Sequence, residues 1–203
     1  MYRTKQPETK MLTEQDYINA ANDLGGNVAA IKAVVDVESL GDGFLASGKL
    51  KILFEGHKFY KYVNDPEQVS KDYPTICFRV STAETRKHYL GGEAEYKRFN
   101  QAFKIDPKAA MLSTSWGRYQ IMGFNYQDAG YKSVDEMIDD YKLGEDKQLL
   151  SFCQFVKKVD LHKCLQGDKP DFAAFASGYN GKSYKINKYD IKLQASFNKF
   201  SSL

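Results

Sequence analysis

The sequence lacks any apolar run near the ~20 residues that a membrane-spanning helix needs, and we expect no membrane insertion. Its three histidines are far apart and have no metal-ligand spacing, so we predict no metal site and no cofactor. The cysteines are also few, odd in number and without a CxxC pair: Cys77, Cys153 and Cys164. Free thiols in a reducing compartment follow from this pattern.

The sequence also lacks internal repeats, low-complexity tracts and proline-rich linkers. Residues 1–11 are polar, have no apolar core of the kind found in a secretory signal, and are expected to form a flexible N-terminal segment. Residues 12–203 are long enough to form one domain with its own core. We therefore expect one monomeric domain, made in the cytoplasm without a signal peptide unless a leader has been removed.

Charge of one sign is not in large excess. The 29 basic and 26 acidic residues leave a net charge of +3, which is compatible with an anionic polymer as partner but does not require one. The stretch GKSYKINKYDIK interleaves tyrosines and lysines, as in binders of single-stranded nucleic acid. We favour an amphipathic helix with a basic outer face that attracts anionic wall polymer, and predict no nucleic-acid partner, because one short stretch is a poor electrostatic footprint.

Apolar residues recur with helical spacing over most of the chain, which predicts a mainly α fold. Thr13, Asn27 and Asp106 are predicted N-caps, and capping boxes are predicted from Ser81 to Glu84 and from Ser133 to Glu136. Alternating residues near 44–54 predict a small β-hairpin. The predicted helices cover 13–25, 27–41, 81–92, 93–105, 106–115, 133–144, 145–162, 169–181 and 187–200.

Glu38 lies on the apolar side of the second predicted helix, because Ile31, Val34 and Val35 share its face. Apolar surroundings and the negative end of the helix dipole both raise the pKa of a carboxyl group. Such an acid can protonate a leaving-group oxygen. From position alone, a structural glutamate paired with a buried Arg or Lys is the favoured interpretation.

Glu55 ends the strand in KILFEGH, where it is predicted to share a sheet face with Leu53. A helix-end acid that faces a strand-borne carboxylate across a cleft is the arrangement of a glycoside hydrolase. Two glutamates alone are a weak signal. Nearby glycines, Gly41, Gly43 and Gly48, would leave room for a bulky ligand.

Four stretches, VESLGDGF, ILFEGHKF, STSWGRYQIMGFN and ASGYNG, occur in this order and together resemble the N-acetylmuramidase family of phage endolysins, in the lysozyme-like superfamily. The resemblance covers about residues 12–200. SWGRYQIMGFN is similar to the glycine–glutamine motif of goose-type lysozymes and lytic transglycosylases, and GYNG to their tyrosine–asparagine motif. The resemblance implies a lysozyme-like helical domain with a small β-hairpin beside the cleft.

The implied activity is cleavage of the β-1,4 bond between N-acetylmuramic acid and N-acetylglucosamine in peptidoglycan, after release through a holin or by delivery machinery. Glu38 matches the catalytic acid, and Glu55 matches a second acidic position. Gly56 departs from the bulkier, often basic residue that the family leads us to expect there, which makes a catalytic role for Glu55 less secure. The matching substrate-binding positions are Ser115, Trp116, Gly117, Gln120, Ile121, Met122, Asn125, Tyr179 and Asn180.

Several roles and outcomes stay open from the sequence. The Gln120 amide suits an N-acetyl group, Trp116 either stacks on a sugar or belongs to the core, and Asn180 either contacts the muramic sugar or seals a turn. Hydrolysis with inversion, hydrolysis with retention and formation of a 1,6-anhydro product, as by lytic transglycosylases, are all compatible with the motifs. A non-catalytic peptidoglycan-binding protein is the alternative from another class.

Overall fold

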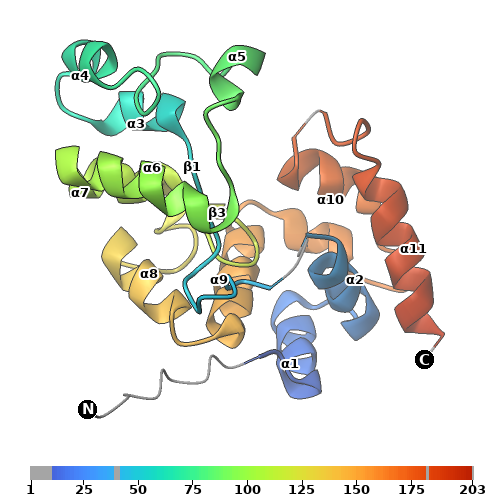
Figure 1. Ribbon diagram of the computed structural model, residues 1–203. Helices are drawn as coiled ribbons and strands as arrows, with labels where there is room; N and C mark the ends of the chain where they lie inside the picture. The colour runs from blue at the N-terminus through green and yellow to red at the C-terminus, as the bar shows by residue number, and fades with distance from the viewer. Residues whose placement is uncertain (1–10, 39–41, 182, 203) are drawn as a thin grey trace, which may run out of the picture.

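The computed structural model describes residues 11–38, 42–181 and 183–202, and it is mainly helical, as the sequence predicts (Figure 1). Within these ranges, no helix combines the length and apolar character that a membrane span requires. The α-helices are α1 Glu14–Leu24, α2 Val28–Glu38, α3 Gly56–Tyr62, α4 Pro66–Asp72, α5 Ala83–Arg86, α6 Gly92–Ile105, α7 Pro107–Leu112, α8 Val134–Tyr141, α9 Glu145–Lys158, α10 Phe172–Tyr179 and α11 Tyr189–Ser201, and the 3-10 turns are η1 Gly123–Asn125 and η2 Leu161–Leu165.

The two ends of the chain pack together. Helix α2 lies against α11 and α1, and α10 packs on α11, while α3–α8 surround a small sheet on the other side of the molecule (Figure 1). The predicted apolar face of α2 is the buried one, since Ile31, Val34 and Val35 are at most 3% exposed. The periodicity of this segment therefore determines which side of α2 enters the core.

Several helices begin where the sequence predicts. The Thr13 side chain accepts from the Asp16 N–H to open α1, and the Asp106 side chain accepts from the Ala109 N–H to open α7. At α8, the Ser133 side chain accepts from the Glu136 N–H. These signals are reliable because a cap and its partner are three residues apart, so no distant part of the chain is needed to form them.

Other local predictions need correction. The capping box predicted at Ser81 lies one residue later, where the Thr82 and Thr85 hydroxyls each accept from the other residue's backbone N–H to open α5. Threonine can replace glutamate in this motif because its hydroxyl also accepts a hydrogen bond. Helices α3 and α4 were not predicted, although Asp65 caps α4 with Pro66 in its first turn.

The small antiparallel β element has a different partner from the one predicted near 44–54. That segment turns back on itself at an isolated bridge between Phe44 and Leu50, with Leu45 N–H donating to the Lys49 carbonyl oxygen at 2.7 Å and Lys51 N–H to that of Gly43 at 2.8 Å. Strand β1 (Ile52–Phe54) pairs beyond this turn with β2 (Thr114–Trp116), which pairs with β3 (Ile121–Met122). Alternation along one strand predicts its faces but not its distant neighbour, so the sequence predicts the local turn and not the pairing with β2.

The register of this sheet separates its two faces. Ile52 is opposite Trp116 on the face that packs against α6, and both side chains are buried. Leu53, Ser115 and Met122 are opposite one another on the other face. Because side chains alternate along a strand, neighbouring residues within β2, such as Ser115 and Trp116, point to opposite sides of the sheet. The same holds for Ile121 and Met122 in β3.

A buried ion pair on α6 fixes the end of β1. The Glu95 carboxylate accepts from the Phe54 N–H at 3.2 Å, and Arg98 donates to the Phe54 carbonyl oxygen at 2.9 Å. Glu95 and Arg98 are 2.5 Å apart, with side chains 0% and 5% exposed. Both peptide groups of Phe54 are thereby held, and the next residue along the chain is Glu55.

Removing one charge of this pair should destabilise the fold strongly. Glu95→Gln leaves the buried Arg98 without its counter-charge, and we expect a loss of about 3 kcal/mol or more in the free energy of unfolding. The matched control is Glu84→Gln, which breaks an exposed pair of the same spacing with Lys87 and should cost less than about 0.5 kcal/mol. Urea denaturation at pH 7 measures both, and equal losses would contradict the clamp.

Candidate active site

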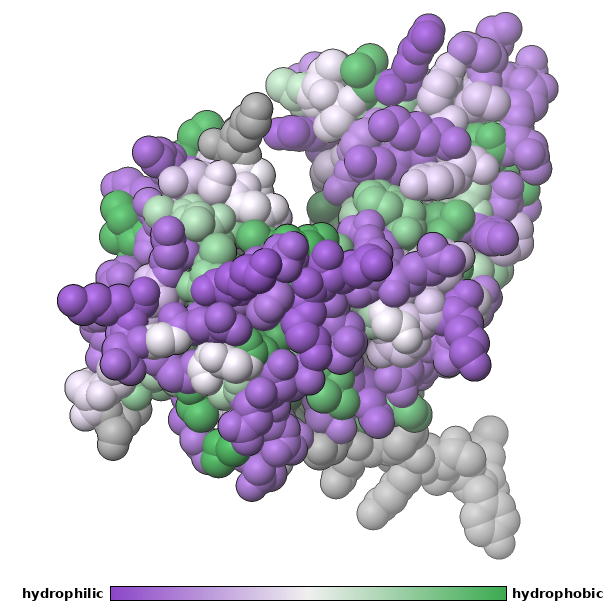
Figure 2. Space-filling model, turned by 180° about the vertical axis from the view of Figure 1, so that it is seen from behind, coloured by the Kyte–Doolittle hydropathy of each residue, from purple (hydrophilic) through white to green (hydrophobic). Residues whose placement is uncertain are grey.

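The surface is hollowed between two parts of the molecule. Figure 2, seen from behind, shows a deep notch at the top between the part that holds α3–α5 and the part that holds α10 and α11. Glu55 opens α3 on the first side, and Tyr179 and Asn180 end α10 on the other. Helix α2, which ends at Glu38, packs beside α11 on the second side. The elements that carry the predicted catalytic and tyrosine–asparagine positions thus lie on the two sides of one notch.

Glu38 is the last residue of α2, directly after the buried apolar face of that helix. Asp36 is exposed and accepts a hydrogen bond from the Ser196 hydroxyl at 2.7 Å. The Glu38 side chain and residues 39–41 lie outside the described part of the chain. The predicted pKa of Glu38, its distance to Glu55 and the role of Gly41 therefore stay predictions.

Glu55 is a partly buried carboxyl group at the N-terminus of α3, with its side chain 23% exposed. Its backbone N–H donates to the Ser113 carbonyl oxygen at 2.9 Å, which extends the strand pairing by one residue. Burial raises the pKa of Glu55 above its usual value, while the positive charges of Lys58 and Arg86 oppose the shift. Glu55 therefore keeps its proton to a higher pH than an exposed glutamate.

His57 lies beside this carboxyl group, with its Nε2 3.2 Å from Glu55 Oε2. Burial and the nearby charges of Lys58, Lys61 and Arg86 lower the pKa of His57, so the ring is neutral at pH 7. Its Nδ1 is buried with no hydrogen-bond partner within the described residues. Because the ring is neutral, its contact with Glu55 is not an ion pair at pH 7.

Gly56 departs from the family pattern for a steric reason. A Cβ at this position would lie 2.4 Å from the Ile76 carbonyl oxygen and 2.4 Å from a ring carbon of Phe78. The segment containing Ile76 and Phe78 crosses directly over α3, which leaves no space for a side chain. A basic neighbour is still present, because His57 supplies it one residue later.

The glycine–glutamine motif forms the turn between β2 and β3. Gly117 has a φ of +70°, and a Cβ there would collide with the Gln148 side chain. The Gln120 amide accepts from the Ser115 hydroxyl and donates to the Gly117 carbonyl oxygen, each at 2.8 Å. The main hydrogen bonds of this amide are thus made within the protein, where they close the turn that carries Ser115.

A buried polar network fixes this turn to α9, and sequence reasoning missed it. Glu145 is fully buried, accepts from the Gly43 N–H at 2.7 Å and pairs with Arg118 at 2.5 Å. Gln148, three residues later, accepts from the Arg118 N–H at 2.6 Å. Gly43, predicted to make room for a ligand, instead makes room for Gln148. The sequence signal was the i, i+3 spacing of Glu145 and Gln148 on an otherwise apolar helix face.

The tyrosine–asparagine motif joins the same turn from the other side. The Tyr179 hydroxyl donates to the Tyr119 carbonyl oxygen at 2.9 Å, and its ring stacks on Phe175 with centroids 5.5 Å apart. Asn180 follows as the residue that ends α10, with its N–H donating to Ala176. Helix α10 is therefore fastened to the segment that carries Gln120, and Tyr179 acts here as a positioning residue.

The remaining predicted positions divide between the two faces of the sheet. Ser115 and Met122 share the face of Leu53, toward Glu55. Trp116 and Ile121 are on the opposite face, where both are buried and the Trp116 ring packs edge-on against Phe99. Asn125 ends the 3-10 turn η1 and is half-buried. No cluster of three or more His, Cys, Asp or Glu side chains suited to a metal ion occurs among the residues described.

Comparisons with known proteins agree with the fold. The N-acetylmuramidase family model matches residues 27–201. The crystal structure of the Burkholderia AP3 phage endolysin is similar to this chain, with a TM-score of 0.88 and 34% sequence identity over 99% of this chain and 76% of that chain. A search of curated proteins gives no match. Since the family model spans most of the sequence, from α2 to α11, the chain belongs to the N-acetylmuramidase family.

Proposed function

We propose that this peptidoglycan hydrolase cleaves the β-1,4 bond between N-acetylmuramic acid and N-acetylglucosamine, with Glu38 as general acid. The observation that supports the proposal is that Glu38 is the last residue of α2, directly after the buried apolar face of that helix. The helix C-terminus and the apolar neighbourhood favour the protonated carboxyl group. A protonated carboxyl group at this point can transfer its proton to the glycosidic oxygen as an oxocarbenium-like state develops.

Glu55 is the candidate for the second carboxylate across the notch. As a base acting through water, its carboxyl group is expected about 6.5–9.5 Å from that of Glu38, with inversion at the anomeric carbon. As a nucleophile, it is expected about 5–5.5 Å away, with retention. His57 is compatible with either role, because it contacts one carboxyl oxygen of Glu55, Oε2, and the other can face a water or a sugar.

A lytic transglycosylase route is the second candidate, and the burial of Glu55 favours it. A carboxyl group whose pKa is raised by burial is a poorer base near neutral pH. In this route the muramic 6-hydroxyl attacks and no second carboxylate is needed. Glu55→Gln separates the candidates, because a base or nucleophile role predicts a loss of about 10²-fold or more in lysis, while the transglycosylase route predicts near-native lysis.

The cellular setting follows from the same family membership. We propose that the protein acts as a monomer on the bacterial cell wall, after release through a holin or by delivery machinery. Its substrate is the glycan strand of peptidoglycan, held in the notch between α3 and α10 (Figure 2). On this face of the molecule, polar residues interrupt the apolar ones (Figure 2). Such a mixed surface suits a sugar polymer better than a lipid surface.

Glu38→Gln should abolish lysis while leaving the fold intact. Gln keeps the shape of the side chain but cannot donate a proton, so we expect at least a ~10²-fold slower clearing of cell-wall suspensions. The control is Asp36→Asn, two residues earlier on the exposed side of α2, which should lyse at the native rate. Lysis by Glu38→Gln at the native rate would show that Glu38 is not the general acid. If the protein is a non-catalytic binder, neither substitution should change binding or the clearing of cell-wall suspensions.

Glu55→Gln should change the pH dependence of stability. The folded protein binds the Glu55 proton more tightly than the unfolded chain, whose carboxyl group titrates near the usual value of 4.5. Stability therefore falls as pH rises from about 4.5 through the higher folded pKa, because the charged form is buried at a cost. Glutamine has no such cost at any pH.

We therefore expect Glu55→Gln to raise the melting temperature relative to the native protein more at pH 7.5 than at pH 4. Glu84→Gln, which removes an exposed carboxylate from the same part of the molecule, should show the same small difference at both pH values. Thermal unfolding followed by circular dichroism makes the comparison. A Glu55→Gln difference that does not change between the two pH values would contradict the assigned direction.

A further inference from the structure

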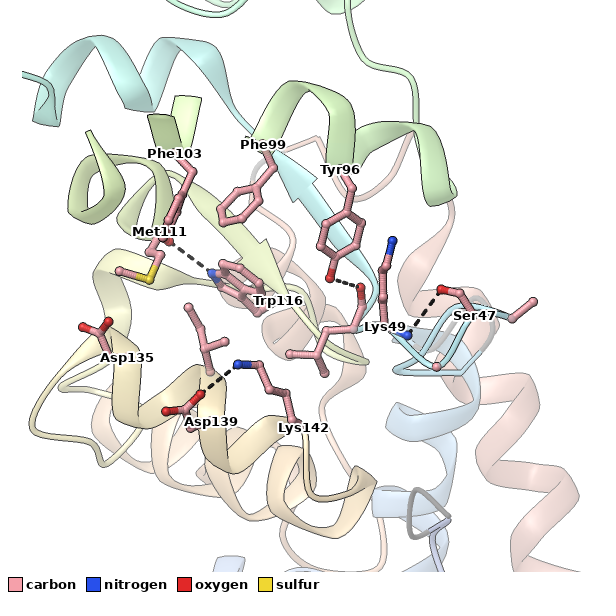
Figure 3. Close-up of a pocket in the computed structure, with 14 residues that line it drawn as sticks. Ser47, Lys49, Tyr96, Phe99, Phe103, Met111, Trp116, Asp135, Asp139 and Lys142 are labelled. Atoms are coloured by element: carbon pink, nitrogen blue, oxygen red, sulfur yellow. Dashed lines mark hydrogen bonds and ion pairs between the residues drawn. The ribbon is translucent and has the colours of Figure 1, made fainter. Parts of the chain in front are cut away.

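A second cavity, of about 820 Å³, lies behind the sheet, on the face opposite Ser115 (Figure 3). Trp116 lies at its back, aromatic residues of α6 form one side and α8 forms the other, and Leu50 also lines it. Sites for small ligands have volumes on the order of 300–1,000 Å³, apolar linings and a few polar groups at fixed positions. The cavity has the size and composition of a ligand site, and the proposed catalysis does not use it.

The aromatic wall offers ring surfaces and no free polar atoms. The Tyr96 hydroxyl donates to the Leu50 carbonyl oxygen at 2.9 Å, and the Trp116 Nε1–H donates to the Met111 carbonyl oxygen at 3.1 Å. Phe103 is 41% exposed although it lines the cavity. The body of a ligand against this wall must therefore be apolar.

Charged groups of both signs lie at the mouth. Asp135, at the start of α8, has no ion-pair partner within 4 Å among the described residues, whereas Asp139, one turn later on that helix, is paired with Lys142 at 2.8 Å. Lys49 lies at the other end of the cavity, over the Tyr96 ring at 5.0 Å from its centroid (Figure 3). Its contact with Glu93 is long, at 3.8 Å, and exposed to solvent.

We propose that this cavity binds a short zwitterionic peptide of the kind that peptidoglycan strands carry. Its small apolar side chains would lie on the ring of Phe103, beside the largely buried Trp116, with its ammonium group at Asp135 and a carboxylate at Lys49. The inference rests on the proposed function for the source of the peptide, because the wall polymer presents alanine methyls together with carboxylate and ammonium groups. Apolar packing supplies the contact area, and the two charges set the direction of the peptide.

The position of the cavity keeps this binding separate from catalysis. Ser115 and Trp116 are consecutive residues of β2, and they point to opposite faces of the sheet. A peptide on Trp116 therefore leaves the notch beside Glu55 open to a glycan strand. Such a site would hold the enzyme on peptide-bearing wall between cleavage events.

Trp116 makes the proposal directly measurable, because it is the one tryptophan of the chain. The probe is the synthetic tetrapeptide L-Ala-γ-D-Glu-L-Lys-D-Ala, titrated into the full chain while tryptophan emission is followed. We expect a saturable change in emission. The same peptide with both amino groups acetylated should bind more weakly, because it has no cation for Asp135.

Two variants assign the change to the cavity. Asp135→Asn should weaken binding about threefold, as for a solvent-exposed ion pair, and Phe103→Ala about fivefold, through loss of ring contact. Asp168→Asn, which removes an exposed carboxylate far along the chain, is the control and should bind as the native protein does. Circular dichroism spectra confirm that the variants are folded.

The outcomes separate this inference from the proposed function. Glu38→Gln should bind the tetrapeptide with native affinity while failing to lyse walls. Lysis by that variant would count against the proposed function but would not affect the proposal of a peptide site in the cavity. Absence of a saturable tryptophan response, or equal affinity in Asp135→Asn, Phe103→Ala and native protein, overturns the peptide site. Binding that appears only after deletion of residues 1–10 overturns it too, because the N-terminal segment would then be the natural occupant.

Discussion

The carboxylate of Glu145 connects the segments that carry the proposed active site. It is fully buried on α9, where it receives the N–H of Gly43, just beyond α2, and the guanidinium of Arg118, in the turn of the glycine–glutamine motif. A buried carboxylate is strongly destabilising unless it is paired and hydrogen-bonded, so both contacts must form together. The chain after Glu38 and the turn that supports Ser115 are therefore placed relative to each other by one charged group.

A second buried pair does the same work on the other side of the notch. Glu95 and Arg98 hold both peptide groups of Phe54, and Glu55 follows directly. The two networks stand on different helices, α9 and α6. The first holds Gly43, in the segment that follows α2, and the second holds Phe54, directly before Glu55. Burying ionic groups costs desolvation free energy, so they add little net stability. Because each buried charge needs its partner at hydrogen-bond distance, few other arrangements of the backbone are compatible with it. We infer that they define the shape of the notch, while the apolar core supplies most of the stability.

Much of the helical fold could be predicted because its signals are local. Thr13 and Asp106 cap helices through partners three residues away, and the spacing of Ile31, Val34 and Val35 marks the buried face of α2. The partner of β1 could not be predicted, because β2 lies some 60 residues further along the chain. The buried acids Glu95 and Glu145 were missed for a related reason. Acidic residues are almost never fully buried unless paired, and their partners are visible only in the fold.

The candidate site was predictable mainly through the family motifs, and the structure changes what several of those residues do. Gly117 and Gln120 make the turn, Tyr179 fastens α10 to it, and Gly43 admits Gln148 from α9. A glycine in a sequence signals close approach but does not say what approaches. Trp116 shows the same limit, since a strand pattern gives alternation but not which face holds the ligand.

The central proposal is that this enzyme cleaves the glycosidic bond that follows N-acetylmuramic acid. Mass spectrometry of peptidoglycan digested to completion tests it most directly, because the fragments report the bond that was cleaved. The account predicts disaccharide products with N-acetylmuramic acid at the reducing end, carrying one added water. Products that end in N-acetylglucosamine, or wall that stays uncut, would contradict the account, and anhydro ends one water lighter would assign the same bond to the transglycosylase route.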